Sequence, residues 1–386
     1  METEKPNFEQ GPIRPPSEAY SLLIRVTRNC TWNKCAFCHI YKGKRFEKRS
    51  VHEVKADIQA AKDIADEIKA LSWRSGYAGE VTREVVEAIF RQPRQYNEQF
   101  RSIALWLYFG GKNVFLQDAN SIVLKTSELV EILKFLKNKF PQVERVTSYG
   151  RSRTIARRKS VEELKELKEA GLTRLHVGLE SGWDFLLQYM NKGVTAAEHI
   201  EAGAKVMESG IELSEYVILG LGGRRWWRQH AQQTAKVLNQ ISPHFIRLRS
   251  LKVLPQMPLQ RRIDEGEFIL QTEEEMIVEE RLLIEGLNGI NSTFLSDHIL
   301  NLLMEVEGKL PEEKEKMLKI IDAFLALPPE EKLNFRLGKR AGIYNSMQDM
   351  SDPSLHRQVE ELMQRLEAEA PGGVEGAISK IKETFL

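Results

Sequence analysis

The three cysteines of this 386-residue chain lie within nine consecutive positions. Cys30, Cys35 and Cys38 have the spacing C-x4-C-x2-C and directly follow a β-rich run. Three thiolates on one loop can hold three irons of a [4Fe–4S] cube and leave the fourth iron open to another ligand. An odd number of cysteines so closely spaced is not a disulfide framework, and it suits a reducing compartment. Because the chain has no other cysteine, a second thiolate-bound cluster is not expected.

Two other uses of these thiols compete with an open-iron cluster. In a zinc site the fourth ligand would be His39, but the adjacent Cys38 and His39 have difficulty reaching one tetrahedral ion. Zinc sites also usually draw their ligands from two separated pairs. A ferredoxin-like electron carrier would need a fourth ligand to complete its cluster. The spacing therefore favours the cluster with an open iron.

The segment RVTRNCTWNKCAFCHIYKG after its strand resembles the radical S-adenosylmethionine superfamily, in particular the group with Elp3-, MiaB- and NifB-like domains. The usual spacing there is C-x3-C-x2-C, and this chain has one more residue between its first two cysteines. The resemblance implies that Cys30, Cys35 and Cys38 hold a [4Fe–4S] cluster whose open iron binds S-adenosylmethionine. It further implies that Phe37 shields the cluster near the adenine.

The resemblance also implies the activity. Reductive cleavage of S-adenosylmethionine would give a 5′-deoxyadenosyl radical that abstracts hydrogen from a substrate. Two alternatives stay open: a non-catalytic iron–sulfur redox sensor or cluster carrier, and a tRNA-modifying radical enzyme. No catalytic residue is assigned. The expected partners are a small-molecule substrate and an electron donor such as flavodoxin or ferredoxin.

Short β-rich runs alternate with amphipathic helical segments along the first two thirds of the chain. The expected strands cover residues 20–27, 113–118, 143–148, 173–180, 212–220 and 244–253. Six strands alternating with helices predict an α/β fold with a parallel sheet and right-handed crossovers. We expect a partial (β/α)6 barrel of the TIM type. Residues 1–19 would form an N-terminal extension, residues 20–259 the core, and residues 260–386 a helical C-terminal region without strands.

Ligands in parallel α/β folds lie at the carboxyl ends of the strands, which directs attention to the residues there. By resemblance, Asp118 after the second strand would receive the ammonium group of S-adenosylmethionine, although an N-terminal helix cap is the alternative. Ser148 and Arg151, after the third strand, would bind the cofactor and its carboxylate. The alternative for Arg151 is an exposed loop rich in arginine.

The fourth and fifth strands also end in candidate cofactor contacts. Glu180 and Ser181 would bind the ribose hydroxyls, since a carboxylate that ends an apolar strand is costly without a partner. In VILGLGG, Ile218 and Gly220 would lie beside the adenine, because glycine lets the backbone approach closely. Each of these assignments follows the resemblance.

Arg247 and Arg249 are two residues apart in the sixth strand and therefore lie on one face of it. Arg249 would bind the cofactor carboxylate. Further guanidinium groups in a closed cavity need anionic partners, so we expect a small acidic substrate. Exposed arginines on an edge strand are the alternative.

Composition sets the remaining limits. With 56 Lys and Arg against 55 Asp and Glu, the net charge is +1, so no nucleic-acid partner is expected. The basic run at residues 42–49 is interpreted as a solvated loop. No apolar run approaches the ~20 residues of a membrane helix, and the polar N-terminus is no signal peptide. We expect a cytoplasmic protein.

Overall fold

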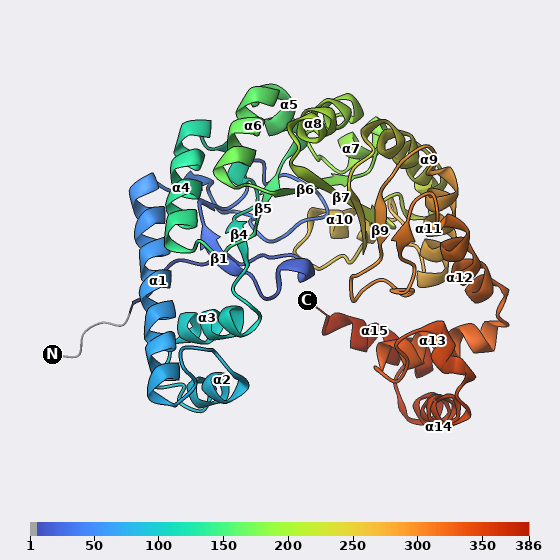
Figure 1. The fold of residues 1–386 in the computed structure, drawn as a ribbon. Coiled ribbons are helices and arrows are strands. Elements are labelled where there is room, and N and C mark those ends of the chain that lie inside the picture. The colour runs from blue at the N-terminus through green and yellow to red at the C-terminus, as the bar shows by residue number, and fades with distance from the viewer. Residues whose placement is uncertain (1–5, 386) are drawn as a thin grey trace. The chain divides into compact units, whose positions relative to one another are not determined.

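The computed structural model describes residues 6–385 and has an α/β fold (Figure 1). Within those residues, eight strands form one sheet in the order β1-β4-β5-β6-β7-β8-β9-β10. The pairs β1/β4, β4/β5, β5/β6 and β8/β9 are parallel, whereas β9 and β10 are antiparallel. The predicted fold class, an α/β fold with a mainly parallel sheet, is therefore confirmed.

The chain divides into two compact units. The first runs to Gly178 and includes Ala197–Ser214, and the second contains Leu179–Ala196 and continues from Glu215. The predicted boundary between core and C-terminal region, at residue 259, stays a prediction. Residues 1–5 of the predicted N-terminal extension lie outside the described residues.

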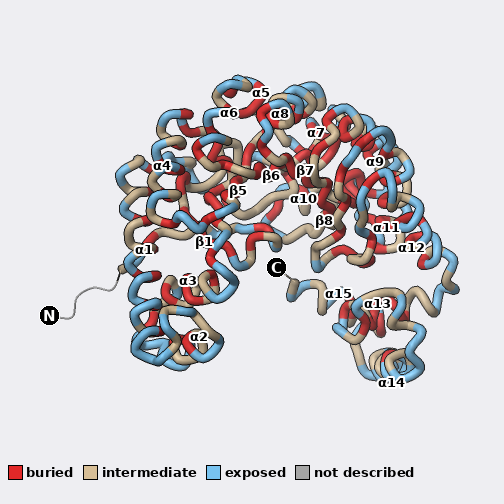
Figure 2. Tube along the Cα trace, viewed as in Figure 1, coloured by how far each residue is buried: buried red, intermediate tan, exposed pale blue. Residues whose placement is uncertain are grey.

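The first unit contains strands β1 (Leu22–Arg25), β4 (Asn113–Gln117) and β5 (Arg145–Gly150), and most of β6 (Arg174–Glu180). Figure 1 shows helices α1 (Val51–Arg74), α4 (Thr126–Lys139) and α6 (Val161–Ala170) beside these strands. Two of the helices begin with capping boxes, Ser50 with Glu53 and Ser160 with Glu163, as their sequences predict. Apolar residues of the strands and of the facing helix surfaces form the core (Figure 2).

Further helices of the first unit complete its connections. Helices α2 (Arg83–Phe90) and α3 (Glu98–Tyr108) precede β4, and α5 (Ser152–Arg158) follows β5. Most of α8 (Ala196–Ser209) also belongs to this unit. Two very short strands, β2 (Thr27–Arg28) and β3 (Glu47–Lys48), form a separate antiparallel ladder around the segment that carries the cysteines.

The second unit contains most of β7 (Glu212–Leu219), with β8 (Phe245–Ser250), β9 (Thr293–Leu295) and β10 (Gly308–Lys309). Its helices begin with α7 (Asp184–Tyr189), α9 (Gly223–Ile241), α10 (Pro258–Asp264), α11 (Glu273–Gly286) and α12 (Lys314–Ala326). The chain continues through α13 (Pro329–Arg340), α14 (Pro353–Glu369) and α15 (Gly373–Glu383). Among the described residues of this unit, α9 packs against α11, and α11 against α12.

Three predictions about elements were wrong. The region after residue 259 contains β9 and β10, which were missed because strands of three and two residues carry no readable alternation. Strand β5 is shifted by two residues from the predicted 143–148, so Ser148 lies within the strand. Helix α9 begins at Gly223, six residues before the predicted residue 229.

In residues 6–385 we find no helix with the length and apolar character needed to cross a membrane.

Candidate functional site

Residues 29–46, here called the cysteine loop, contain neither helix nor strand. The β2/β3 ladder closes the loop at its base by pairing Thr27 with Lys48 and Arg28 with Glu47. Within the loop, Asn29 has φ of +68°, in a region that asparagine tolerates better than most residues. The Asn29 side chain donates a hydrogen bond to the Arg45 carbonyl (2.6 Å). The loop is therefore folded back on itself by hydrogen bonds of its own.

Asn33 provides the second fixed point inside the cysteine loop. It also adopts a left-handed backbone conformation, with φ of +54°. Its side-chain amide donates to the carbonyls of Tyr41 and, at 3.1 Å, of Lys44. The chain between Asn33 and Tyr41 thus forms a closed turn that contains two of the three cysteines.

The thiols of Cys30, Cys35 and Cys38 are all partly exposed on this loop. The backbone N–H of Cys38 donates to the Cys35 carbonyl at 3.5 Å, which places Phe37 on the turn between them. Among residues 6–385, no three His, Cys, Asp or Glu side chains are grouped closely enough to hold a metal ion. Binding of a cluster therefore requires the thiols to move together. The donor set itself, three soft thiolates on one irregular loop, fits an iron–sulfur cluster.

Asp118, at the end of β4, is fully buried and contacts both ends of the cysteine loop. Its Oδ2 accepts hydrogen bonds from the Arg25 guanidinium (2.6 Å) and from the Asn29 backbone N–H (3.1 Å). Its Oδ1 accepts the hydroxyl of Tyr41. Burial and the Asp118 carboxylate raise the pKa of Tyr41, so this phenol stays protonated and donates.

Asp118 is not a helix cap, because Asn120 precedes the short 3-10 helix Ser121–Val123 that follows β4. A contact between Asp118 and the ammonium group of S-adenosylmethionine stays a prediction. Such a contact would have to share a carboxylate that already accepts three hydrogen bonds.

Asn120 joins the cysteine loop to the chain after β5. Its amide donates to the hydroxyls of Thr31 and Thr154, both at 3.0 Å, and its oxygen accepts the Arg151 N–H at 3.0 Å. Sequence reasoning passed over Asn120, although it lies in the same QDAN segment as Asp118. Its side chain places Arg151 next to the cysteine loop.

The Arg151 guanidinium lies 5.4 Å from the ring centre of Trp32, a residue of the cysteine loop. Burial lowers the pKa of Arg151, while the nearby thiols of Cys30 and Cys35 act in the opposite direction. Arg151 is therefore a buried cation beside the cysteines, rather than part of an exposed arginine-rich loop. Its predicted contact with the cofactor carboxylate is not tested by these contacts.

Ser148 lies on the opposite side of β5 from its neighbour Tyr149, because side chains alternate along a strand. The Ser148 side chain is fully buried, and its hydroxyl donates to the Leu116 carbonyl of the adjacent strand (3.3 Å). The predicted hydrogen bond from Ser148 to the cofactor remains a prediction.

Glu180 and Ser181 belong to the second unit. Glu180 has φ of +61°, and its carboxylate accepts a hydrogen bond from Lys192 (2.8 Å). The acidic side chain thus has an internal partner, which removes the energetic argument for an external one. Ser181 is fully buried, and its hydroxyl accepts the Trp183 N–H (3.2 Å). Both predicted ribose contacts stay predictions.

Ile218 lies near the end of β7, and Gly220 follows that strand with φ of +82°. A Cβ at Gly220 would stand 3.0 Å from the sulfur of Met276, so the absence of a side chain is already needed for packing. The proposed approach of adenine to Ile218 and Gly220 is not tested by these contacts.

Arg247 and Arg249 lie on one face of β8, as predicted, and both bind Asp297. Arg249 contacts this carboxylate at 3.2 Å and lies 4.6 Å from the ring centre of Tyr216. The expectation that these arginines lack an internal acidic partner is therefore wrong, as is the alternative that they are exposed on an edge strand. The argument for an acidic substrate loses its basis, because Asp297, about 50 residues away in sequence, was not identified as their partner.

A buried hydrogen-bonded pair in the second unit was also missed. His230 on α9 lies 2.6 Å from Glu279 on α11, measured from Nδ1 to Oε1. His230 Nε2 donates to the Glu180 carbonyl (3.1 Å), and the second Glu279 oxygen accepts the Gly220 N–H (3.1 Å). The pair therefore fixes the backbone of two predicted cofactor-binding residues. Nothing in the sequence reveals a pair formed by two separate helices.

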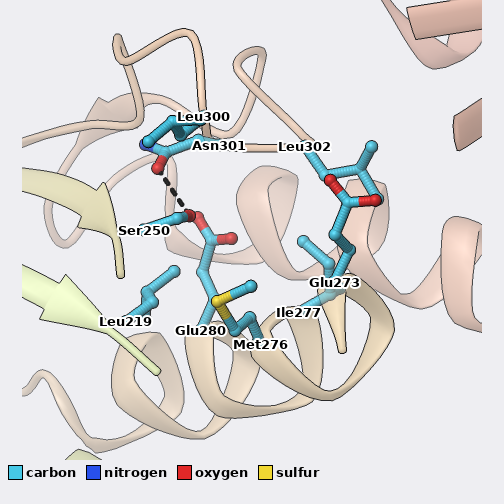
Figure 3. Close-up of a pocket in the computed structure, with 9 residues that line it drawn as sticks. All are labelled: Leu219, Ser250, Glu273, Met276, Ile277, Glu280, Leu300, Asn301 and Leu302. Carbon is cyan, nitrogen blue, oxygen red and sulfur yellow. Dashed lines mark hydrogen bonds between the residues drawn. The ribbon is translucent and has the colours of Figure 1, made fainter. Parts of the chain in front are cut away.

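A small cavity of about 10 Å³ lies beside this pair's helices in the second unit. Figure 3 shows Ser250 hydrogen-bonded to Asn301 at its rim (2.9 Å), with Glu280 next to them. Glu280 is buried, and in the described residues its Oε1 has no hydrogen-bond partner. Burial, with Glu305 and Glu279 nearby, raises the pKa of Glu280 to about 8. The cavity has room for about one water molecule and is too small for a substrate.

A family model described as the Radical SAM superfamily matches residues 24–232. This span includes the cysteine loop, the end of β7 and the beginning of α9. Because the match covers more than half of the chain, the protein belongs to the radical S-adenosylmethionine superfamily. The predicted family is confirmed. No curated protein matches the sequence.

Three solved structures illustrate the similarity of fold. The cobalamin-dependent S-adenosylmethionine radical enzyme OxsB with aqua-cobalamin is 14% identical, with a TM-score of 0.45 over 94% of this chain and 52% of that one. Coproporphyrinogen III oxidase from Escherichia coli is 16% identical, with a TM-score of 0.43 over 69% and 51%. The Elp3 of Methanocaldococcus infernus with an N-terminal deletion is 14% identical, with a TM-score of 0.41 over 55% and 54%. The matched part spans about half of each of these structures, and we infer no reaction from them.

Members of this superfamily are enzymes that use a [4Fe–4S] cluster and S-adenosylmethionine. The family match thus confirms the predicted enzyme class and both predicted cofactors. The assignment of individual residues to these cofactors stays a prediction.

Proposed function

We propose that this protein cleaves S-adenosylmethionine reductively and abstracts a hydrogen atom from a small-molecule substrate. The observation that supports this most directly is the cysteine loop, which carries all three cysteines of the chain within its family-matched region. Cys30, Cys35 and Cys38 would hold the cluster through three irons and leave one iron open. When bound and reduced, the cluster supplies the electron that splits S-adenosylmethionine into methionine and a 5′-deoxyadenosyl radical.

The residues around the loop would bind and orient the cofactor. Arg151, held by Asn120 beside Cys30 and Cys35, would provide positive charge for the cofactor carboxylate. Phe37 would cover the cluster from the turn between its two cysteines. These assignments depend on residues of the first unit only.

The second unit would provide the remaining cofactor contacts. Glu180 and Ser181 would accept the ribose hydroxyls, with Lys192 holding the Glu180 carboxylate in place. Ile218 and Gly220 would lie beside the adenine. Arg249 would contribute a positive charge, since Arg247 and Arg249 together share one carboxylate, that of Asp297.

An external reductant and a reducing compartment complete the proposal. The electron would come from a small redox protein such as flavodoxin or ferredoxin. The three thiols are suited to the cytoplasm, where cysteines stay reduced. Because Asp297 neutralises part of the charge of Arg247 and Arg249, we propose no chemical class for the substrate beyond a small molecule.

Formation of 5′-deoxyadenosine tests the proposal. The protein is reconstituted with iron and sulfide without oxygen, and then given dithionite and S-adenosylmethionine. We expect 5′-deoxyadenosine and methionine from the wild-type protein and neither from Cys35→Ala. A cluster that is reduced but never cleaves the cofactor would instead support a redox sensor, and RNA that copurifies with the protein would support tRNA modification.

A further inference from the structure

The cysteine loop is held by contacts from outside the loop as well as by its own asparagines. Asp118 lies at the end of β4, about 90 residues after Asn29 in the sequence. It is the point where β1, through Arg25, and both ends of the loop meet. Such a convergence on one fully buried carboxylate calls for a role beyond filling space.

The geometry of the contacts is specific to the two ends of the loop. Asn29, whose N–H bonds Asp118 Oδ2 at 3.1 Å, immediately precedes Cys30. Tyr41, whose hydroxyl bonds Asp118 Oδ1, follows Cys38 by three residues. All three cysteines therefore lie between two anchors on the same carboxylate.

The charge of Asp118 is balanced without any ligand. Arg25 donates to Asp118 at 2.6 Å and to Glu9 at 2.8 Å, so the guanidinium bridges two carboxylates. The packing is tight as well, because a Cβ at Gly11 would stand 3.0 Å from Asp118 Oδ1. The carboxylate therefore has little freedom to turn toward another partner.

We propose that Asp118 is a positioning residue that clamps the two ends of the cysteine loop and so keeps the cluster in place. This inference rests on the proposed function, in which the three cysteines hold the cluster. Asp118 acts through Asn29 and Tyr41, whose backbone and side chain it holds, and not by touching the cluster or S-adenosylmethionine. Tyr41 is the second member of the clamp.

The test compares three variants of the full chain. Asp118→Asn changes the acceptor, Tyr41→Phe removes one anchor, and Glu18→Gln is the matched control. Glu18 is also a fully buried carboxylate of the first unit, bonded to Ser21 and Arg145, but its printed contacts do not involve the cysteine loop. All three variants lose hydrogen bonds of a buried carboxylate, so a merely structural loss would affect them alike.

The first measurement is the rate at which anaerobically reconstituted protein loses iron to a chelator. We expect this rate to rise about tenfold in Asp118→Asn, the factor typical of losing a charged hydrogen bond, and severalfold in Tyr41→Phe. The double variant should resemble Asp118→Asn, because both changes remove the same contact. Wild-type iron release in Asp118→Asn, or an equal increase in Glu18→Gln, would overturn the clamp. Weakened S-adenosylmethionine binding with unchanged iron release would also overturn it, in favour of direct cofactor contact.

The second measurement needs no cluster. Amide hydrogen exchange of the apo protein should become faster within residues 29–46 in Asp118→Asn and remain unchanged there in Glu18→Gln. If exchange in this segment is unaffected by Asp118→Asn, the clamp is wrong whether or not the wild-type protein takes up iron. If the wild-type protein takes up no iron while exchange responds as expected, the proposed function fails and the clamp stands.

Discussion

Individual side chains around the predicted cofactor site have internal partners. Glu180 binds Lys192, Asp118 binds Arg25 and Tyr41, and Arg247 and Arg249 bind Asp297. A charged side chain with such a partner costs less to bury, but it can still accept or donate further hydrogen bonds. The partners therefore define what each variant would disturb besides ligand binding.

Replacement of Glu180 separates cofactor binding from cluster retention. Glu180→Ala should keep its iron but bind S-adenosylmethionine more weakly by ~1–3 kcal/mol, the usual cost of losing a charged hydrogen-bonding partner. Equilibrium binding to the reconstituted protein measures this. Lys192→Met is the control, because it removes the partner of Glu180 and leaves the carboxylate. Equal affinity in Glu180→Ala and wild type would leave Glu180 with a structural role only.

Glu280 makes stability depend on pH. Its folded pKa of about 8 lies above the ordinary value of 4.5, so the folded state holds a proton that the unfolded state releases between these values. The free energy of unfolding should therefore fall as pH rises from about 4.5 to about 8, by up to about 1.4 kcal/mol per pH unit. In Glu280→Gln this contribution is absent. Urea unfolding at pH 5.5 and pH 8 measures it.

The expected result is that Glu280→Gln gains stability relative to wild type at the higher pH. Glu315→Gln, an exposed glutamate of α12 in the same unit, serves as the control and should show no such gain. A constant difference between Glu280→Gln and wild type at both pH values would show that Glu280 is ionised in the folded protein.

At the scale of elements, pairs of helices fix the ends of strands. Helices α9 and α11 hold the chain after β6 and β7 through His230 and Glu279. With Nε2–H donated to the Glu180 carbonyl, a second proton must lie between His230 Nδ1 and the Glu279 carboxylate. The two residues thus form one unit that loses its function when either is removed.

His230→Leu should destabilise the protein by about 3–5 kcal/mol, because it leaves the Glu279 carboxylate buried with only the Gly220 N–H as partner. Chemical denaturation measures the loss. The double variant His230→Leu/Glu279→Met should lose less than the sum of the two single variants, since it removes the unpaired charge. Simple additivity would mean that the two side chains do not depend on each other.

Sequence patterns predicted most of the strands but few of the partners. Alternating apolar residues and capping boxes located α1, α4, α6 and the strands up to β8, because these signals are local. The short strands β9 and β10 offered too few residues for such a signal. The partner of Arg249, Asp297, depends on tertiary folding and has no local signal, whereas the cysteine spacing identified the family directly.

At the scale of the whole molecule, the predicted cofactor contacts divide between the two units. The cysteine loop, Asp118, Ser148 and Arg151 belong to the first unit. Glu180, Ser181, Ile218, Gly220 and Arg249 belong to the second. The proposed function therefore requires S-adenosylmethionine to engage residues of both units, and a variant in either unit should weaken its binding.

The central claim is that three thiolates hold a cluster whose open iron binds S-adenosylmethionine. Electron paramagnetic resonance of the dithionite-reduced protein, with and without the cofactor, tests this directly. We predict the signal of a reduced [4Fe–4S] cluster that changes when S-adenosylmethionine is added, and the loss of that signal in Cys30→Ala, Cys35→Ala and Cys38→Ala. A cluster signal that S-adenosylmethionine leaves unchanged, or one that survives the loss of Cys35, would contradict the account.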